Sequence, residues 1–286
     1  MPKLSRFVFL FIHFHFLSFA GAFCPRIDLR QEKFLPTQFL QEERDWCFAF
    51  AAAASVSSLV QKPISAEDLA LHHNLREMQA HLASDETSQE ILKVSLASIK
   101  ATEVLGFAGG SISEAVNLLA RKGYCLESDG GSSSNIHQIL NLQFQSSSAS
   151  DLLGFWNQKC VSRISARGIL KLFPLLKSRD RQRALIKIQK ALQQNLIPSL
   201  SVDGNLVLKA LGQPTSEVRQ PHAIAVVGQE TNSQGQCVYF VRDSFSGKNI
   251  SILASLVLLS SDQLFEPVRA QIHDKLLDQE LDLPPF

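Results

Sequence analysis

The sequence has no excess of charge of either sign. Its 28 lysine and arginine residues are balanced by 27 aspartate and glutamate residues, which leaves a formal net charge of +1 at pH 7. A chain with so little net charge gives no reason to expect nucleic acid or a charged membrane surface as its partner. We therefore look for function in local motifs.

Long hydrophobic runs are also missing, apart from one at the N-terminus. That run extends from Phe7 to Leu17, is interrupted by two histidines and is too short to span a bilayer comfortably. Two basic residues precede it, and the small residues 20–22 follow it. This order predicts a secretory signal peptide over residues 1–22, cleaved near Ala22, with a signal anchor as the alternative. We expect an exported protein (secreted, periplasmic or lumenal) without a membrane span after cleavage.

Cysteine is scarce and odd in number. In an oxidising compartment an odd count leaves one thiol over. If that thiol is Cys47, the other four cysteines can form two disulfides in any of three pairings. The alternative is that some of them are buried thiols. The five residues are Cys24, Cys47, Cys125, Cys160 and Cys237.

Metal-binding motifs are not evident. His72, His73 and His81 fall on a predicted helix, where we expect them to be exposed, and no cysteine or carboxylate pattern completes a metal site with them. We therefore predict neither a metal nor a cofactor.

The order of local patterns predicts an α+β protein with two lobes and a cleft between them. Residues 48–60 are mostly alanine, phenylalanine, valine and serine, which predicts a buried helix starting at or just before Cys47. Short apolar runs in the second half predict paired strands, with a hairpin turn at Asp203-Gly204. We expect a helical lobe over about 41–127, an insertion over about 128–180, a β lobe over about 181–270, and a tail over 271–286. The basic stretch over 159–190 is predicted to be a solvated helix face, with a basic exosite as the alternative.

Two residues are candidates for the nucleophile and the base of a cysteine-dependent reaction. A nucleophilic cysteine must be a thiolate, and a helix N-terminus and a nearby imidazolium both favour that form. Cys47 lies at the predicted helix start, and Asp45 is a candidate cap for that helix. His222 follows Pro221 and opens the apolar strand HAIAVV, where a base could face a cleft. A structural histidine is the alternative.

Four segments, in this order along the chain, resemble papain-like cysteine peptidases. They are QEERDWCFAF, GFAGG, PHAIAVVG and YFVRDSFSG, and they extend from about Gln41 to Gly247. Gln41 stands six residues before Cys47, as the oxyanion glutamine does in that family. The family's usual disulfide between these first two segments is missing, because its positions hold Arg44 and Phe107.

The resemblance implies a role for each matching residue. Cys47 would be the nucleophile, His222 the base and Gln41 an oxyanion donor. Asp243 would orient His222, in a position where the family usually has asparagine. The implied substrate-binding residues are Gly109 and Gly110 as a backbone strip, Ile112 as the wall of an apolar pocket, Trp46 beside the nucleophile, and Phe245 in place of the usual tryptophan.

The implied activity is hydrolysis of peptide bonds in peptide or protein substrates through an acyl-enzyme, by a monomer. Cleavage near Ala22 would make Cys47 the twenty-fifth residue of the mature chain, which is where we expect it if no long propeptide is present. Three alternatives remain. The chain could be a papain-fold binding protein whose bulky Arg44, Asp45 and Trp46 obstruct the cleft, an acyl transferase to amines, or an α+β protein with a core cysteine.

Overall fold

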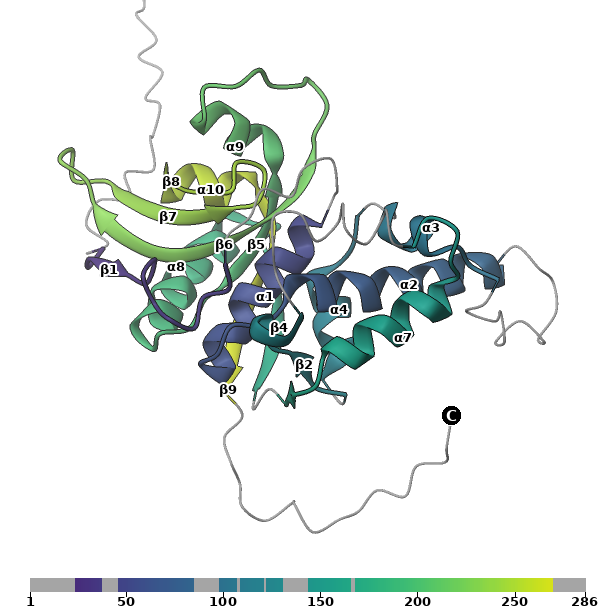
Figure 1. Ribbon diagram of the computed structural model, residues 1–286. Coiled ribbons are helices and arrows are strands. Elements are labelled where there is room, and N and C mark those ends of the chain that lie inside the picture. Colours follow the sequence, from purple (N-terminus) through teal and green to yellow (C-terminus); the bar gives the residue numbers. More distant parts are fainter. Residues whose placement is uncertain are drawn as a thin grey trace, which may run out of the picture.

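The computed structural model describes residues 24–37, 46–84, 98–106, 109–120, 122–130, 144–165 and 168–269. Within these ranges the chain has a helical part followed by a part dominated by an antiparallel sheet (Figure 1). The elements of the first part are β1 (Ile27–Asp28), α1 (Cys47–Val60), α2 (Ala66–Ser84), α3 (Ala101–Gly106), α4 (Ile112–Leu119), β2 (Tyr124–Cys125), α5 (Glu127–Gly130), α7 (Ala149–Lys159) and β3 (Arg163–Ile164). Those of the second part are β4 (Gly168–Pro174), α8 (Ser178–Gln193), β5 (Ser199–Asp203), α9 (Gly204–Ala210), β6 (Pro221–Thr231), β7 (Cys237–Asp243), β8 (Lys248–Leu253), α10 (Ala254–Ser260) and β9 (Ser261–Arg269).

Each part has a hydrophobic core of its own, so the predicted α+β architecture with two lobes is confirmed. In the helical lobe, α1, α2, α3, α4 and α7 surround a core that contains Trp46, Leu105 and Trp156. In the sheet lobe the strand order is β4-β9-β5-β6-β7-β8, with β1 pairing to β6 beyond the end of β5. Helices α8, α9 and α10 pack on this sheet around Ile188, Val226 and Val257.

Helix α1 lies between the two lobes and contacts both of them, α2 and α4 on one side and β5, β6 and β9 on the other. Twelve of its 14 residues are buried, as the sequence predicted. Alanines let the sheet approach closely, and buried serines supply the polar contacts. The Ser55 hydroxyl donates to the Ile197 carbonyl (2.7 Å), and the Ser199 hydroxyl donates to the Ala51 carbonyl (2.9 Å). These bonds fix the position of α1 on β5.

Two expectations differ from the structure. The interval 128–180 is not one insertion, because α7 packs in the helical lobe and β4 is an edge strand of the main sheet, paired with β9. The Asp203-Gly204 hairpin is wrong as well. The Asp203 carboxylate accepts the Asn205 N–H (3.0 Å) and caps α9, which begins at Gly204. A capping aspartate followed by glycine is compatible with either structure, so the local sequence does not decide between them.

Four of the five cysteines form two disulfides, and Cys47 is the remaining free thiol. Cys24 is bonded to Cys237 at the start of β7, and Cys125 is bonded to Cys160 at the end of α7. This is one of the three pairings that the sequence left open. In the described part of the chain, no helix is both long enough and apolar enough to cross a membrane. The predicted signal peptide lies outside the described residues.

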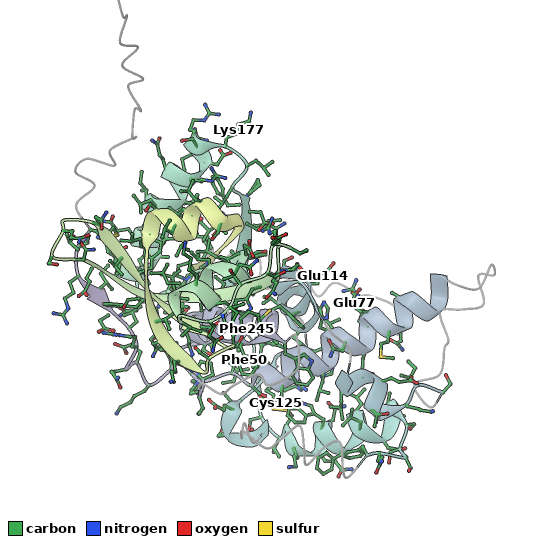
Figure 2. The ribbon with its side chains drawn as sticks, turned by 90° about the horizontal axis from the view of Figure 1, so that it is seen from above. Phe50, Glu77, Glu114, Cys125, Lys177 and Phe245 are labelled. Carbon is green, nitrogen blue, oxygen red and sulfur yellow. A yellow bond between two sulfur atoms is a disulfide. The ribbon has the colours of Figure 1, made fainter. Side chains whose placement is uncertain are left out.

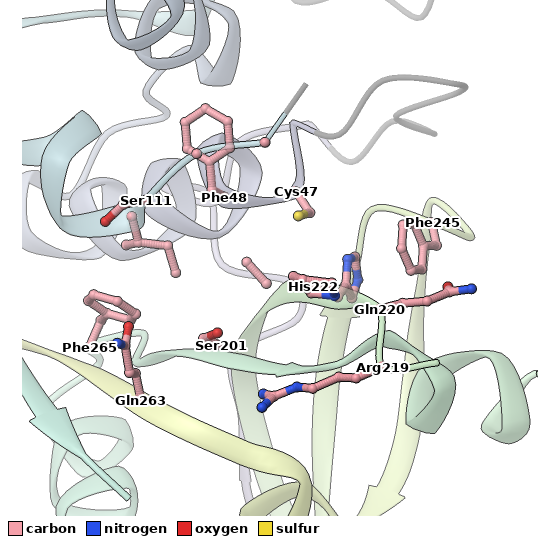
Figure 3. Close-up of a pocket in the computed structure, with 15 residues that line it drawn as sticks. Cys47, Phe48, Ser111, Ser201, Arg219, Gln220, His222, Phe245, Gln263 and Phe265 are labelled. Atoms are coloured by element: carbon pink, nitrogen blue, oxygen red, sulfur yellow. The ribbon is translucent and has the colours of Figure 1, made fainter. Parts of the chain in front are cut away.

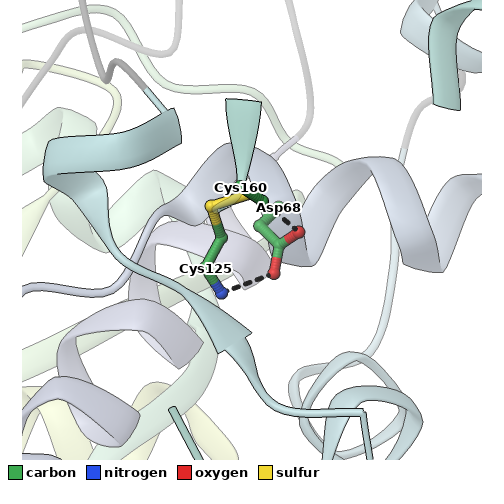
Figure 4. Close-up of side chains that lie close together, drawn as sticks. All are labelled: Asp68, Cys125 and Cys160. Atoms are coloured by element: carbon green, nitrogen blue, oxygen red, sulfur yellow. Dashed lines mark hydrogen bonds between the residues drawn. A yellow bond between two sulfur atoms is a disulfide. The ribbon is translucent and has the colours of Figure 1, made fainter. Parts of the chain in front are cut away.

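A buried carboxylate, that of Asp68, connects several elements of the helical lobe. Asp68 has no exposed surface and accepts hydrogen bonds from the Cys125 backbone N–H, the Trp156 indole and the Arg163 guanidinium. Figure 4 shows the contact with Cys125 beside the Cys125–Cys160 disulfide. The donor–acceptor distances are 3.0 to 3.2 Å. Burial, together with the Arg163 charge, lowers the pKa of the neighbouring His72 despite the opposing effect of Asp68. Asp68 thus joins α2 to β2, α7 and β3.

We predict that Asp68→Asn destabilises the protein by about 3 kcal/mol, because breaking a buried ion pair leaves the Arg163 charge uncompensated. Either orientation of the new amide also places an NH2 group against a donor. The free energy of unfolding from denaturant titration measures the effect. Glu217→Gln, an exposed carboxylate in a loop, is the control and should change stability by less than about 0.5 kcal/mol. A loss of less than about 1 kcal/mol in Asp68→Asn contradicts this role.

Candidate active site

Cys47 is the first residue of α1, so its side chain lies at the positive end of a 14-residue helix. The residue is largely buried but lines a cavity between the lobes.

The preceding Trp46 is completely buried in the core of the helical lobe. The expectation that Trp46 lines the cleft is therefore wrong. Gln41 and Asp45 lie outside the described residues, so their proposed roles stay predictions.

His222 and Asp243 come together from two neighbouring strands. His222 is the second residue of β6, Asp243 is the last residue of β7, and both side chains are fully buried. The imidazole Nε2 lies 2.8 Å from Asp243 Oδ1. The other carboxylate oxygen accepts the backbone N–H and the hydroxyl of Ser246, both at 2.7 Å. With the Asp243 carboxylate fixed on Nε2, Nδ1 faces Cys47 across the junction of the lobes (Figure 3).

The charged form of this histidine is favoured by its neighbours. Burial lowers the pKa of His222, but the hydrogen bond with Asp243 and the charges of Asp243 and Cys47 outweigh burial and raise it to about 9. Burial raises the pKa of Asp243, and the contacts with His222 and Ser246 bring it below its usual value. His222 stabilises the folded state while it is protonated. Its contribution is therefore complete below pH 6.5 and is lost as the pH rises through about 9.

Phe245 covers the imidazole from one side. Its ring stacks on His222 with a centroid distance of 3.7 Å and an interplanar angle of 13°. The face of an aromatic ring attracts a cation, so this contact also favours imidazolium. Gly204 lies behind the pair, where a Cβ atom would be 3.0 Å from Phe245 Cε2 and 3.3 Å from His222 Cβ. Only glycine fits here without moving one of the two rings.

The cavity has a volume of about 520 Å³, and both lobes form its walls (Figure 3). It brings together six of the predicted site residues: Cys47, Gly109, Gly110, Ile112, His222 and Phe245. Asp243 lies behind His222 instead of in the wall. Sequence reasoning missed the other lining residues, Phe48, Ser111, Ser201, Arg219, Gln220, Pro221, Ala223, Gln263 and Phe265. Ala223 adjoins His222 and could have been found, but Gln263 and Phe265 carry no local signal.

The two glycines of the GFAGG segment occupy different environments. Gly109 has a φ of +84°, which disfavours any side chain. A Cβ atom on Gly110 would lie 2.6 Å from the Phe48 ring and 2.8 Å from His73 Cε1. Both positions border the cavity, so this strip of backbone runs along its wall without side chains.

Comparison with known proteins finds similar folds among solved structures. No family model matches the sequence, and no curated protein matches it either. Several solved structures do match. The proform of Amb a 11, a cysteine protease and ragweed pollen allergen, aligns with a TM-score of 0.52 at 11% identity, over 88% of this chain and 67% of its own. The recombinant stem bromelain precursor aligns with a TM-score of 0.50 at 15% identity, over 86% and 70%. A structure from work on the mite allergens Blo t 1 and Der p 1 aligns with a TM-score of 0.51 at 15% identity, over 88% and 74%.

These matches agree with the two lobes. The protein has the α+β fold of the papain-like cysteine peptidases. At 11–15% identity the likeness concerns the fold, and the chemistry has to be argued from the residues of this chain.

We predict that Asp243→Asn lowers the pKa of His222 by about 1 to 2 units, because the charged acceptor that favours imidazolium is lost. NMR titration of the labelled ring measures the shift. Glu230→Gln changes a carboxylate at the opposite end of β6 and should leave the His222 pKa unchanged. An unchanged pKa in Asp243→Asn would show that the carboxylate charge does not control this imidazole.

We also predict that Gly204→Ala slows alkylation of Cys47 by iodoacetamide about tenfold, because the new methyl group displaces Phe245 or His222. The free energy of unfolding is measured alongside, because the new methyl group would also lie 3.2 Å from the Gln220 carbonyl oxygen. Gly154→Ala in α7 is the matched control, as nothing lies within 4 Å of its Cβ position. Equal alkylation rates in the two variants would rule out a positioning role for Gly204.

Proposed function

We propose that this protein is an exported cysteine peptidase that hydrolyses peptide bonds through Cys47, His222 and Asp243. The observation that supports it best is the meeting of these residues at one cavity. A free cysteine at a helix N-terminus faces an imidazole whose far nitrogen contacts a buried carboxylate. The papain-like fold, shared with the matched cysteine proteases, is the second observation that supports the proposal.

The proposed reaction begins with attack of the Cys47 thiolate on a substrate carbonyl carbon. The oxyanion would be held by the backbone N–H of Cys47 and, in this proposal, by the amide of Gln41. The imidazolium of His222 would give its Nδ1 proton to the leaving amine. It would then accept a proton from the water molecule that hydrolyses the thioester. Asp243 keeps Nε2 protonated and the ring in place throughout.

The substrate would lie along the strip of Gly109 and Gly110 as an added strand, with a side chain in the apolar part of the cavity near Ile112 and Phe265. The two disulfides suit an exported protein. The binding-only alternative loses part of its basis because Trp46 is buried in the core and cannot obstruct the cleft.

Labelling with an epoxide inhibitor of papain-like enzymes tests the proposal. We expect one adduct, located at Cys47 by peptide mass and lost in His222→Ala. Cys47→Ala should lower peptide turnover by at least about a thousandfold while circular dichroism shows an intact fold. Undiminished cleavage by Cys47→Ala contradicts the proposal. So does the absence of any adduct on folded protein between about pH 4 and pH 8, and that result favours a binding protein.

A further inference from the structure

His73 is a buried histidine that the proposed chemistry does not use. It lies on α2, where the sequence predicted an exposed ring, but its side chain is only 3% exposed. The ring packs against Phe48, with a centroid distance of 4.6 Å, and against the backbone of Gly110. Its orientation is therefore fixed by the wall of the cavity. The expectation of exposed histidines is therefore wrong for His73 and also for His72, whose side chain is 12% exposed.

Two carboxylates lie next to this ring. Glu114, in the first turn of α4, places Oε2 at 3.7 Å from His73 Nε2. Glu77 is one helical turn beyond His73 on α2, and an oxygen of each carboxylate and one ring nitrogen all lie within 4.8 Å of one another. Figure 2 shows Glu77 and Glu114 beside each other on the same side of the helical lobe. The sequence signal was present in the four-residue spacing of His73 and Glu77, but Glu114 comes from a different helix.

The hydrogen bonding of His73 indicates that a cation belongs between these groups. The Ser111 backbone N–H donates to Nε2 at 3.4 Å, so in this tautomer Nε2 carries a lone pair. The Glu114 carboxylate then faces an acceptor, which is unfavourable without a positive charge between the two. A proton on Nε2 would supply that charge, but it would oppose the Ser111 N–H. Among the described residues the His73 Nδ1 atom has no hydrogen-bond partner that could compensate.

We propose that His73, Glu77 and Glu114 bind a divalent transition-metal cation, with Zn²⁺ as the best candidate. One imidazole nitrogen and two carboxylate oxygens suit Zn²⁺, with water in the remaining position. Ligands of a tetrahedral zinc at 2.0–2.1 Å lie about 3.3 Å apart, close to the 3.7 Å between Nε2 and Oε2. Glu77 is half-buried and Glu114 is exposed, so both side chains have room to close on the ion.

The site borders the cavity without being part of the proposed catalytic group. Ser111 and Gly110 line the cavity, and their backbone contacts His73 from the other side. A metal on Nε2 would displace the Ser111 N–H and join α2 to α4. The proposal does not depend on the peptidase function, because it rests on the helical lobe alone.

The other group of possible ligands is Asp68 with Cys125 and Cys160. Its two sulfur atoms are already bonded to each other, and the carboxylate is fully used by Arg163, Trp156 and the Cys125 N–H. A cation would have to displace the guanidinium, so these residues are a structural centre (Figure 4).

Calorimetric titration with Zn²⁺ tests the proposal, on full-length protein without an affinity tag. Cys47→Ala is the parent, because the thiol and imidazole of the cavity would themselves bind zinc. We expect one equivalent of Zn²⁺ to bind, and Co²⁺ to give the visible absorption of a protein-bound ion. Glu77→Gln and Glu114→Gln should each weaken binding at least about tenfold. Glu103→Gln, an exposed carboxylate on α3, should bind like the parent.

The two glutamate variants change side chains that are not in the core, so their folds should be intact by circular dichroism. Zn²⁺ should raise the melting temperature of the parent and of Glu103→Gln but not of the other two variants. Absence of saturable Zn²⁺ binding in Cys47→Ala overturns the proposal. Equal affinity in the parent, Glu77→Gln and Glu114→Gln overturns it as well, because the ion would then be bound elsewhere.

Discussion

The packing of α1 against the sheet is the constraint on which the candidate site depends. Cys47 belongs to the helical lobe and His222 to the sheet lobe, so their distance is set by how closely and in which register α1 lies on β5 and β6. Alanine side chains permit a close approach. The bonds of Ser55 and Ser199 determine the register, because a buried hydroxyl left without its partner would be costly. The interface between α1 and the sheet therefore determines the geometry of the site.

The charge of Asp243 distinguishes the His222 environment from one with a neutral acceptor. A buried imidazolium is unfavourable by itself, and here a carboxylate, an aromatic face and the negative charge of a Cys47 thiolate all favour it. Ser246 in turn stabilises the carboxylate by two hydrogen bonds. Such an arrangement keeps His222 protonated far into the alkaline range. In the proposed reaction the proton for the leaving amine is then already in place at neutral pH, while the raised pKa makes the imidazolium a weaker acid and the neutral imidazole a stronger base toward water.

The helical lobe contains two buried polar side chains with different surroundings, Asp68 and His73. Asp68 has a full set of donors, including an internal guanidinium, and so forms a closed structural centre. His73 has a lone pair and a carboxylate facing each other at the edge of the lobe, which is an open arrangement. Of these two groups in the described part of the chain, the His73 group is the one for which we propose a ligand. His73 also connects the cavity wall at Gly110 and Ser111 with the surface that carries Glu114.

Local sequence determined the features that depend on neighbouring residues. The alanine run predicted α1 with Cys47 at its start, and the order of four motifs indicated the fold. The tertiary structure decided what depends on distant partners. It buried Trp46, selected the Cys24–Cys237 and Cys125–Cys160 pairs, and brought Glu114 to His73. Periodicity and capping act over a few residues. The environment of a side chain is set by segments that fold against it from elsewhere in the chain, and no local pattern encodes them.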